Sequence, residues 1–313
     1  MKSQISKMVY DLIIIGADSA GLSAGIYAGR KQIKTLIISK KIGGQSVLAN
    51  NIENYPGFLS VSGEKLISKM KKQVENFGVV IEEKEVVSIK KNKNTFIIET
   101  GEKKYESKTV IIATGRHWRS LNVPGENEFL GKGVSTCAIC DAPFYSGKDV
   151  AVIGGGNSAF SSAYDLLKYA SKVYILQHRE NFIGDKSMHE KLEKSGKVEF
   201  LNNAETKEIR GTKFVESLVY EDIKSKQMKE LKVGGVFVSI GQIPNSDFAE
   251  SFLELNNFRE IIIDCKTNET SVRGVFAAGD VTNVKYKQSI IAAGEGAKAA
   301  LSVSDFLKGS GIV

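Results

Sequence analysis

The stretch Tyr10–Arg30, YDLIIIGADSAGLSAGIYAGR, decides the fold of this 313-residue chain. Its first part, Tyr10–Gly16, is an apolar run with the length and branched residues of a buried strand, and it ends in a glycine turn. The run Ala20–Arg30 is typical of a helix, and a second strand is predicted at Lys34–Ile38. Strand, glycine turn, helix and strand in this order form the βαβ unit of a doubly wound parallel sheet.

The same order returns near the middle of the chain. An apolar strand at Asp149–Gly154 leads into consecutive glycines, a helix-like run covers Ser158–Tyr169, and a further strand is predicted at Lys172–Leu176. The fold class is therefore α/β, with two Rossmann-like domains that are each doubly wound in three layers.

Four further segments assign the rest of the chain to these domains. Thr109–Gly115 and Gly234–Pro244 each have the pattern of a strand ending in a turn, as at the exit from a Rossmann domain. The tail holds a strand at Gly274–Asp280 and an alanine-rich helix at Ser289–Leu307, which we expect to return to the first domain. We predict a discontinuous first domain of residues 1–116 and 248–313, with residues 117–247 inserted as the second domain.

Composition is that of a globular protein, with 42% hydrophobic and 25% charged residues. The apolar runs have strand length, and Met1–Tyr10 lacks the apolar stretch of a secretory signal, so we expect a cytoplasmic protein that binds neither membrane nor nucleic acid. The net charge of +7 indicates a solvated lysine-rich surface or, alternatively, a basic face for an acidic protein partner.

The cysteines carry the strongest chemical signal. Cys137 and Cys140 form a C-x-x-C pair, a spacing that suits an easily reduced disulfide, and Asp141 is the candidate proton donor or acceptor beside it. Half of a zinc site is a poor alternative, because no second C-x-x-C pair exists, and we expect no metal. Cys265 ends the apolar run Ile261–Cys265 and is predicted to be a packed strand residue.

The two glycine turns differ in quality. The first, Gly16–Gly21, carries Asp18 where a dinucleotide fingerprint has its middle glycine, which places a carboxylate where an anion should bind. A Rossmann-like unit without nucleotide is the alternative there. The second, Gly154–Ala159, is a good G-x-G-x-x-A turn and predicts a nicotinamide cofactor, although the next strand ends with only Arg179 as a firm positive charge.

Taken together, these motifs resemble those of the low-molecular-weight thioredoxin reductase family, and the match runs nearly end to end. Its order and spacing are far more specific than any one motif. The residues that carry it are Ile15–Arg30, Gly43-Gly44-Gln45, Glu53–Gly57, Ala113-Thr114-Gly115, Cys137–Asp141, Gly154–Ala159, Gly241–Pro244 and Gly279-Asp280.

The resemblance implies an FAD domain built from both chain ends, an inserted pyridine-nucleotide-type domain that rotates, and a homodimer. It implies that Cys140 faces the isoalloxazine ring of FAD and that Cys137 attacks the disulfide of thioredoxin. Asn54, Thr114, Asp280 and Gln288 are expected around the flavin and its ribityl chain. The full set of cofactor-binding residues expected from the resemblance is Gly16, Ser19, Ala20, Ser39, Gly44, Gln45, Asn54, Ala113, Thr114, Gly115, Gly279, Asp280, Gln288 and Ser289.

The second domain departs from the family pattern. Ser161 and Ser162 stand where the family has two glutamates, and of its basic phosphate-binding patch only His178 and Arg179 remain, with Glu180 reversing the third position. These departures are typical of the ferredoxin-dependent flavin thioredoxin reductase branch, and a basic protein would attract an acidic ferredoxin.

Three hypotheses follow for the electron path. The first runs from reduced ferredoxin through FAD and the Cys137–Cys140 dithiol to thioredoxin disulfide. The second keeps this enzyme but uses NADH or NADPH as the donor. The third is a flavin and thiol redox sensor without turnover. Ferredoxin–NADP reductases share the fold but lack the thiol pair, so Cys137 and Cys140 argue against that reaction.

Overall fold

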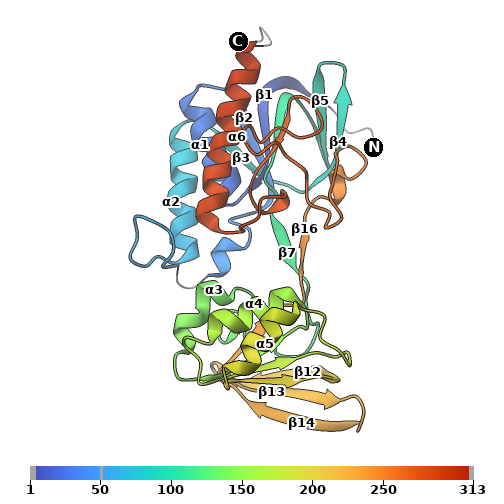
Figure 1. Ribbon diagram of the computed structural model, residues 1–313. Coiled ribbons are helices and arrows are strands. Elements are labelled where there is room, and N and C mark those ends of the chain that lie inside the picture. Colours follow the sequence, from blue (N-terminus) through green and yellow to red (C-terminus); the bar gives the residue numbers. More distant parts are fainter. Residues whose placement is uncertain (1–4, 50–51, 310–313) are drawn as a thin grey trace. The chain divides into compact units, whose positions relative to one another are not determined.

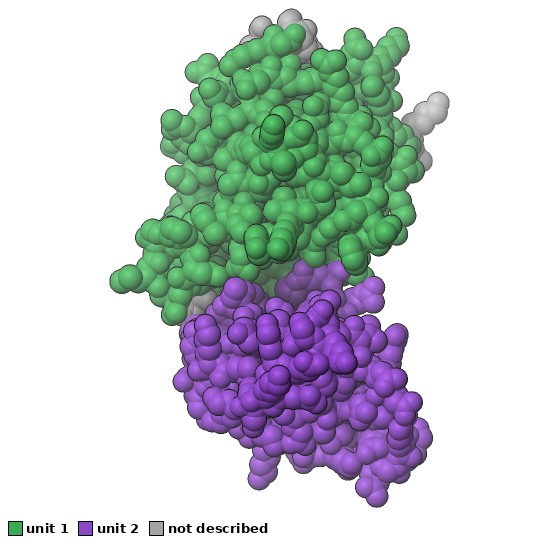
Figure 2. Space-filling model, viewed as in Figure 1, with its two compact units in different colours: residues 1–117, 243–313 green, residues 118–242 purple. Residues whose placement is uncertain are grey.

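The computed structural model describes residues 5–49 and 52–309, and it divides into two compact units (Figure 2). Unit 1 holds residues 1–117 and 243–313, and unit 2 holds residues 118–242. The second junction therefore falls five residues before the predicted one at 247. The reason is local: Asn245 donates its backbone N–H to the Gly115 carbonyl at 3.0 Å, which fixes this segment to unit 1.

Unit 1 is built on a seven-stranded sheet in the order β3-β2-β1-β6-β5-β4, with β17 paired to β6. The central strand β1 pairs in parallel with β2 and β6, so that Ile13 stands opposite both Leu36 and Val110. Leu12, Ile13 and Ile14 are completely buried, as a strand covered on both faces requires. The strands are β1 (Ile5–Ala17), β2 (Thr35–Ile42), β3 (Val80–Glu83), β4 (Val86–Asn92), β5 (Thr95–Thr100), β6 (Lys104–Ile112) and β17 (Val275–Ala277).

Three helices cover one face of this sheet: α1 (Ser19–Arg30), α2 (Gly63–Asn76) and α6 (Ser289–Gly309) (Figure 1). Helices α1 and α6 approach closely because small residues meet there. A Cβ added at Gly296 would lie 2.0 Å from the Ala20 carbonyl oxygen, so only glycine fits. This packing brings the first turn of α1 against α6. Short 3₁₀ turns lie at η1 (Ser46–Leu48), η3 (Asp247–Ala249) and η4 (Gly279–Val281).

Unit 2 repeats the architecture on a smaller scale. A parallel five-stranded sheet runs in the order β11-β10-β9-β15-β8, and an antiparallel sheet runs in the order β12-β13-β14. The strands are β8 (Val134–Ser135), β9 (Asp149–Ile153), β10 (Lys172–Leu176), β11 (Val198–Leu201), β12 (Ala204–Gly211), β13 (Val215–Asp222), β14 (Gln227–Lys232) and β15 (Gly235–Val238). The helices are α3 (Ala138–Asp141), α4 (Asn157–Leu166) and α5 (Lys186–Lys194), with a 3₁₀ turn η2 at Ala142–Tyr145.

The two chain segments that connect the units form a two-stranded sheet of β7 (Arg116–Trp118) and β16 (Gln242–Pro244). Within the described residues, 5–49 and 52–309, no helix is long and apolar enough to cross a membrane.

The prediction for Cys265 is wrong. The residue is exposed and lies outside any strand, and its thiol is free. The cause is Asp264, whose Oδ1 accepts hydrogen bonds from the backbone N–H groups of Lys266 and Thr267 at 2.6 and 3.2 Å. This Asx-type turn ends the extended run one residue before the cysteine.

Candidate functional site

The carboxyl ends of the parallel strands of unit 1 meet at one edge of the sheet, where ligands bind in doubly wound folds. Gly16 lies at the end of β1 there with φ +113°, and a Cβ at this position would lie 2.2 Å from the Ala113 carbonyl oxygen. Glycine therefore allows the turn after β1 to lie directly against the end of β6. Gly279, with φ +75°, follows β17 at the same edge.

Asp18 holds the beginning of α1. Its Oδ1 accepts from the backbone N–H of Ser19 at 2.6 Å, and its Oδ2 accepts from the backbone N–H of Ser46 at 3.3 Å. The carboxylate thus connects the first turn of α1 with the loop that contains Gly43–Gln45. The sequence placed a carboxylate where an anion should bind. In the structure this carboxylate stays within the site and accepts hydrogen bonds from backbone N–H groups there.

The loop that follows β2 contacts both Arg116 and the start of α6 through its side chains. Gln45 donates its side-chain amide to the Arg116 carbonyl at 2.5 Å, and the hydroxyls of Ser46 and Ser289 lie 3.3 Å apart. Asn54 donates to Oε1 of Gln288 at 3.1 Å. Three of the predicted cofactor residues, Asn54, Gln288 and Ser289, are thereby gathered around the N-terminus of α6.

Thr114 and Gly115, which follow β6, have different surroundings. The Thr114 hydroxyl donates to the Asn245 carbonyl at 2.7 Å, and the Asn245 side chain donates back to the Thr114 carbonyl at 2.8 Å. A Cβ added at Gly115, which has φ +66°, would meet nothing within 4 Å, so the residue borders open space. Asn245 was missed by the sequence analysis, and its only signal was its place beside the Gly241–Pro244 motif.

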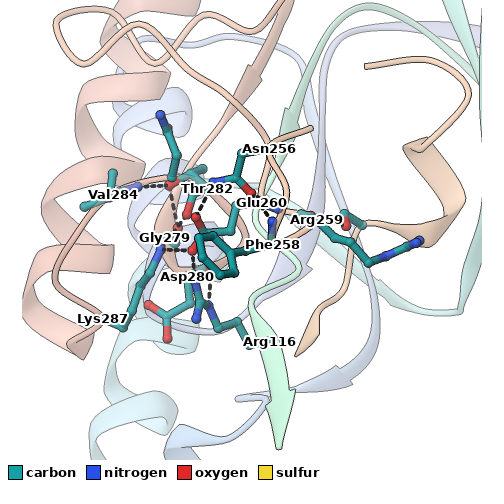
Figure 3. A network of polar contacts seen from close by, with 12 residues as sticks. Arg116, Asn256, Phe258, Arg259, Glu260, Gly279, Asp280, Thr282, Val284 and Lys287 are labelled. Atoms are coloured by element: carbon teal, nitrogen blue, oxygen red, sulfur yellow. Dashed lines mark hydrogen bonds and ion pairs between the residues drawn. The ribbon is translucent and has the colours of Figure 1, made fainter. Parts of the chain in front are cut away.

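A network of largely buried charges surrounds Asp280 (Figure 3). The guanidinium of Arg116 donates to the Asp280 carbonyl at 2.7 Å and forms an ion pair with Glu260. Lys287 contacts the same Glu260 oxygen at 3.2 Å, and all three charged side chains are no more than 16% exposed. Asn256 donates to the other Glu260 oxygen at 2.7 Å. The sequence predicted Asp280 but none of these partners.

Burial sets the protonation of this network. It raises the pKa of Asp280, and the nearby charge of Asp18 adds to the rise while the cations of Lys287 and Arg116 oppose it. Burial also lowers the pKa of Lys287, against the pull of Glu260. Two carboxyl groups, Asp18 and Asp280, therefore interact at this edge of the sheet.

Ser39 has a structural task. Its hydroxyl accepts from the Ala17 backbone N–H at 3.2 Å and donates to the Lys41 carbonyl at 2.9 Å, so its single proton is used within the backbone of this loop. Lys40, the next residue, pairs with the exposed Glu85. The residues Ser39–Lys41 thus offer no acidic group for a ribose, as the sequence indicated.

The predicted thiol pair is confirmed as a disulfide between Cys137 and Cys140, with 5.3 Å between the Cα atoms. The Asp141 backbone N–H donates to the Cys137 carbonyl, which closes the short helix α3. Ser135, which the sequence analysis missed, donates its hydroxyl to Asp141 Oδ2 at 2.6 Å and accepts from the Cys137 N–H at 3.1 Å. Burial raises the pKa of Asp141. Burial, with a contribution from the charge of Asp141, raises the pKa of Tyr145 to about 12.

The second glycine turn keeps its expected backbone form. Gly154 has φ +140°, and a Cβ there would lie 2.4 Å from the Ser239 carbonyl oxygen. Gly155 packs against the side chain of the buried Gln177, whose amide would lie 2.1 Å from a Cβ. Helix α4 begins at Asn157 without a side-chain cap, an arrangement that suits a phosphate-binding helix.

In the segment after β10, the acidic Glu180 is part of an exposed ion pair. Glu180 binds Lys224 at 2.6 Å, a partner that lies 44 residues away and that the sequence analysis did not identify. The Ser162 hydroxyl lies 3.0 Å from the Ser239 hydroxyl, so one of the two serines found where the family resemblance implies glutamates contacts the residue after β15.

The residues of unit 1 fit an FAD. Positive-φ glycines bring the strand ends together, Gly115 leaves space, and the N-termini of α1 and α6 lie at the same edge. Asp18 is the exception, because it already occupies N–H donors. The contacts of single residues with the cofactor stay predictions.

Comparisons with known proteins agree with this geometry. A family model described as pyridine nucleotide-disulphide oxidoreductase matches residues 10–296. A thioredoxin reductase from Streptococcus pyogenes superposes with a TM-score of 0.93 and 35% identity, covering 97% of this chain and all of that one. A thioredoxin reductase from Giardia duodenalis gives 0.91 and 34%, covering 96% and 100%.

Curated relatives include an NADH dehydrogenase of Bacillus subtilis, 39% identical over 302 residues, or 96% of this chain and 59% of the relative. One component of the alkyl hydroperoxide reductase of Escherichia coli is 40% identical over 304 residues, or 95% and 58%. The chain spans about three-fifths of the length of these relatives. With its two Rossmann-like units and its Cys137–Cys140 disulfide, the chain belongs to the pyridine nucleotide-disulphide oxidoreductase family and is a thioredoxin reductase-like flavoprotein with FAD as its cofactor.

Proposed function

We propose that this chain is an NAD(P)H-dependent disulfide reductase that delivers electrons through FAD and the Cys137–Cys140 dithiol to thioredoxin or a thioredoxin-like protein. The observation that carries the proposal is the Cys137–Cys140 disulfide with the partly buried Asp141 beside it. The homodimer and the contacts of the single cofactor residues belong to the same proposal, on the strength of the family resemblance.

The choice of donor reverses the order of the sequence hypotheses. A relative of 39% identity is named an NADH dehydrogenase, and the glycine turn of unit 2 has the backbone form of a dinucleotide site. Both observations support the nicotinamide donor. None of the relatives named above is described as ferredoxin-dependent, and ferredoxin stays an untested alternative resting on Ser161, Ser162 and Glu180.

When bound, FAD would supply a carrier that accepts two electrons from the donor and passes them on to the disulfide. The chain's own residues then carry out the exchange. The Cys137 thiolate attacks a partner sulfur, forms a mixed disulfide and releases one partner thiolate. The Cys140 thiolate attacks the Cys137 sulfur, which restores the Cys137–Cys140 bond and releases the second partner thiolate. Asp141, with its raised pKa, holds the proton that a leaving thiolate takes up.

The donor is tested by anaerobic mixing of the flavin-loaded protein with NADH, NADPH or reduced ferredoxin, while the visible flavin absorption is followed. We expect NADH or NADPH to bleach the flavin within seconds and to support repeated turnover with thioredoxin. Bleaching by ferredoxin alone would contradict the nicotinamide donor and return the chain to the first sequence hypothesis.

Replacement of Asp141 by Asn should slow the dithiol–disulfide step roughly 100-fold, because a general acid contributes about this much. Flavin reduction by the donor should stay unchanged. Since burial raises the pKa of Asp141, the protonated form persists at higher pH than for an ordinary aspartate, and the step should slow as pH rises through that pKa. Stopped-flow traces across pH measure both effects.

Ser135 offers the matched control. Its hydroxyl donates to Asp141 and stabilises the charged form. Ser135→Ala should therefore shift the fall in rate to higher pH rather than abolish it. A pH profile that is identical in Asp141→Asn and the unmodified protein would show that another group supplies the proton.

A further inference from the structure

The dinucleotide turn of unit 1 contains an acidic residue whose position the structure now shows. Asp18 is the N-cap of α1, a helix of 12 residues, and its Oδ1 accepts from both the N–H and the hydroxyl of Ser19, at 2.6 and 3.3 Å. Its Oδ2 accepts from the Ser46 N–H, and a Cβ added at Gly44 would lie only 2.7 Å from that oxygen. The carboxyl group is therefore wedged between the start of α1 and the Gly43–Ser46 loop.

The Ser19 N–H lies at the start of the first helix, where a dinucleotide pyrophosphate binds in a Rossmann fold. Backbone N–H groups at the start of the first helix, together with its dipole, attract a negatively charged ligand. In this chain the Asp18 carboxylate already accepts from one of them, the Ser19 N–H, and it adds a negative charge beside a ligand that carries two. A like charge at such short range disfavours the ionised form of an acid.

Among the residues that the structure describes, the charged groups near Asp18 come from η4, from β2 and from the segments around Arg116 and Lys287. Asp280, in η4, lies close enough for the charge of Asp18 to raise its pKa, while Arg116 and Lys287 are both engaged with Glu260. The Gly43–Ser46 loop contributes amide and hydroxyl groups, and the start of α6 contributes the Ser289 hydroxyl.

The polar side chains at the end of β2 are either bonded to other groups or exposed. Ser39 is hydrogen-bonded to the backbone, Lys40 forms an ion pair with Glu85, and Lys41 is exposed.

We propose that this chain takes up one proton at Asp18 when it binds FAD, so that the cofactor is held tightly at acidic pH and released as the pH rises. In the FAD-free protein the Asp18 carboxylate caps α1. In the complex the carboxyl is neutral and donates rather than accepts, which frees the Ser19 and Ser46 N–H groups for the pyrophosphate. Burial already favours the neutral form, because it raises the pKa of Asp18, and the hydrogen bonds from Ser46 and Ser19 oppose that rise.

Linkage fixes the sign of the effect. Below the pKa of Asp18 in the FAD-free protein, the group is protonated in both states and affinity is independent of pH. Above that pKa the free protein must gain a proton to bind, so the FAD dissociation constant should rise about tenfold per pH unit. It should level off above the still higher pKa of Asp18 in the complex.

The test is a titration of the full chain, stripped of FAD, with FAD between pH 5 and pH 9, followed by flavin fluorescence. We expect a rising dissociation constant for the unmodified protein and a tight, pH-independent one for Asp18→Asn. Asparagine is as good an N-cap as aspartate, so α1 should be retained, and circular dichroism checks this. Calorimetry in buffers of different ionisation enthalpy should report uptake of about one proton, absent in Asp18→Asn.

Asp185→Asn is the matched control, since Asp185 is also an N-cap aspartate but begins α5 in unit 2. It should keep the pH dependence of the unmodified protein. A pH-independent dissociation constant in the unmodified protein would overturn the proposal. So would an unchanged slope in Asp18→Asn, which would assign the proton to another group such as Asp280. Neither result depends on which donor reduces the flavin.

Discussion

Replacing both Cys137 and Cys140 by serine should abolish disulfide reduction and leave the flavin bound. The two sulfurs are bonded to each other, and serine cannot form the mixed disulfide on which exchange depends. Turnover with thioredoxin should fall by at least about 1,000-fold, to the background of the assay, because covalent catalysis is lost entirely. Flavin reduction by the donor should persist, since the predicted FAD residues all lie in unit 1 and the thiols lie in unit 2.

The chain offers a matched control for this experiment. Cys265 is a free, exposed cysteine in unit 1, so Cys265→Ser should leave turnover unchanged. The single variants separate the proposed roles: Cys140→Ser should trap thioredoxin in a mixed disulfide with Cys137, and Cys137→Ser should not. Turnover that survives the double substitution would refute the proposed electron path and favour a flavin that reduces its substrate directly.

The fold could be predicted because its signals are local. Each βαβ unit combines an apolar strand, a glycine turn and a helix in one short continuous stretch, and helix α1 begins one residue before the predicted Ala20 because Asp18 caps it. Helix α4 ends at Leu166, three residues before the predicted Tyr169. There the Tyr169 carbonyl accepts from the Gly147 N–H, which lies outside the helix. Helix propensity depends on neighbouring residues alone and could not predict this contact.

The candidate site was only half predictable for the same reason. Motif residues such as Cys137 and Asp280 are marked by their neighbours in the sequence. Glu260 is not, because it meets Arg116 across 144 residues, and nothing in the run Arg259–Ile263 distinguishes a buried acid from a surface one. Ser135 was missed although it lies two residues from Cys137, since a serine beside a thiol pair has no fixed meaning until its hydroxyl is placed.

That buried network supports the second large effect. Glu260→Ala should destabilise unit 1 by about 3 kcal/mol, because removing one partner of a buried ion pair leaves the other charge uncompensated. Here two cations would be affected, since Arg116 and Lys287 both contact the same Glu260 oxygen and all three side chains are largely buried. For a unit of this size such a loss lowers the melting temperature by roughly 10 °C.

The comparison that isolates this effect uses a second ion pair of the same kind on the surface. Glu180 and Lys224 are each more than 60% exposed, so Glu180→Ala should leave the melting temperature unchanged within error. Arg116→Ala added to Glu260→Ala should recover part of the loss, because it removes one of the two stranded cations, and a double-mutant cycle gives the coupling between them. Recovery would show that the cost comes from unpaired charge. If the double variant is instead less stable by the sum of the two single losses, the side chains contribute independently, through packing, and the network does not act as a unit around Asp280.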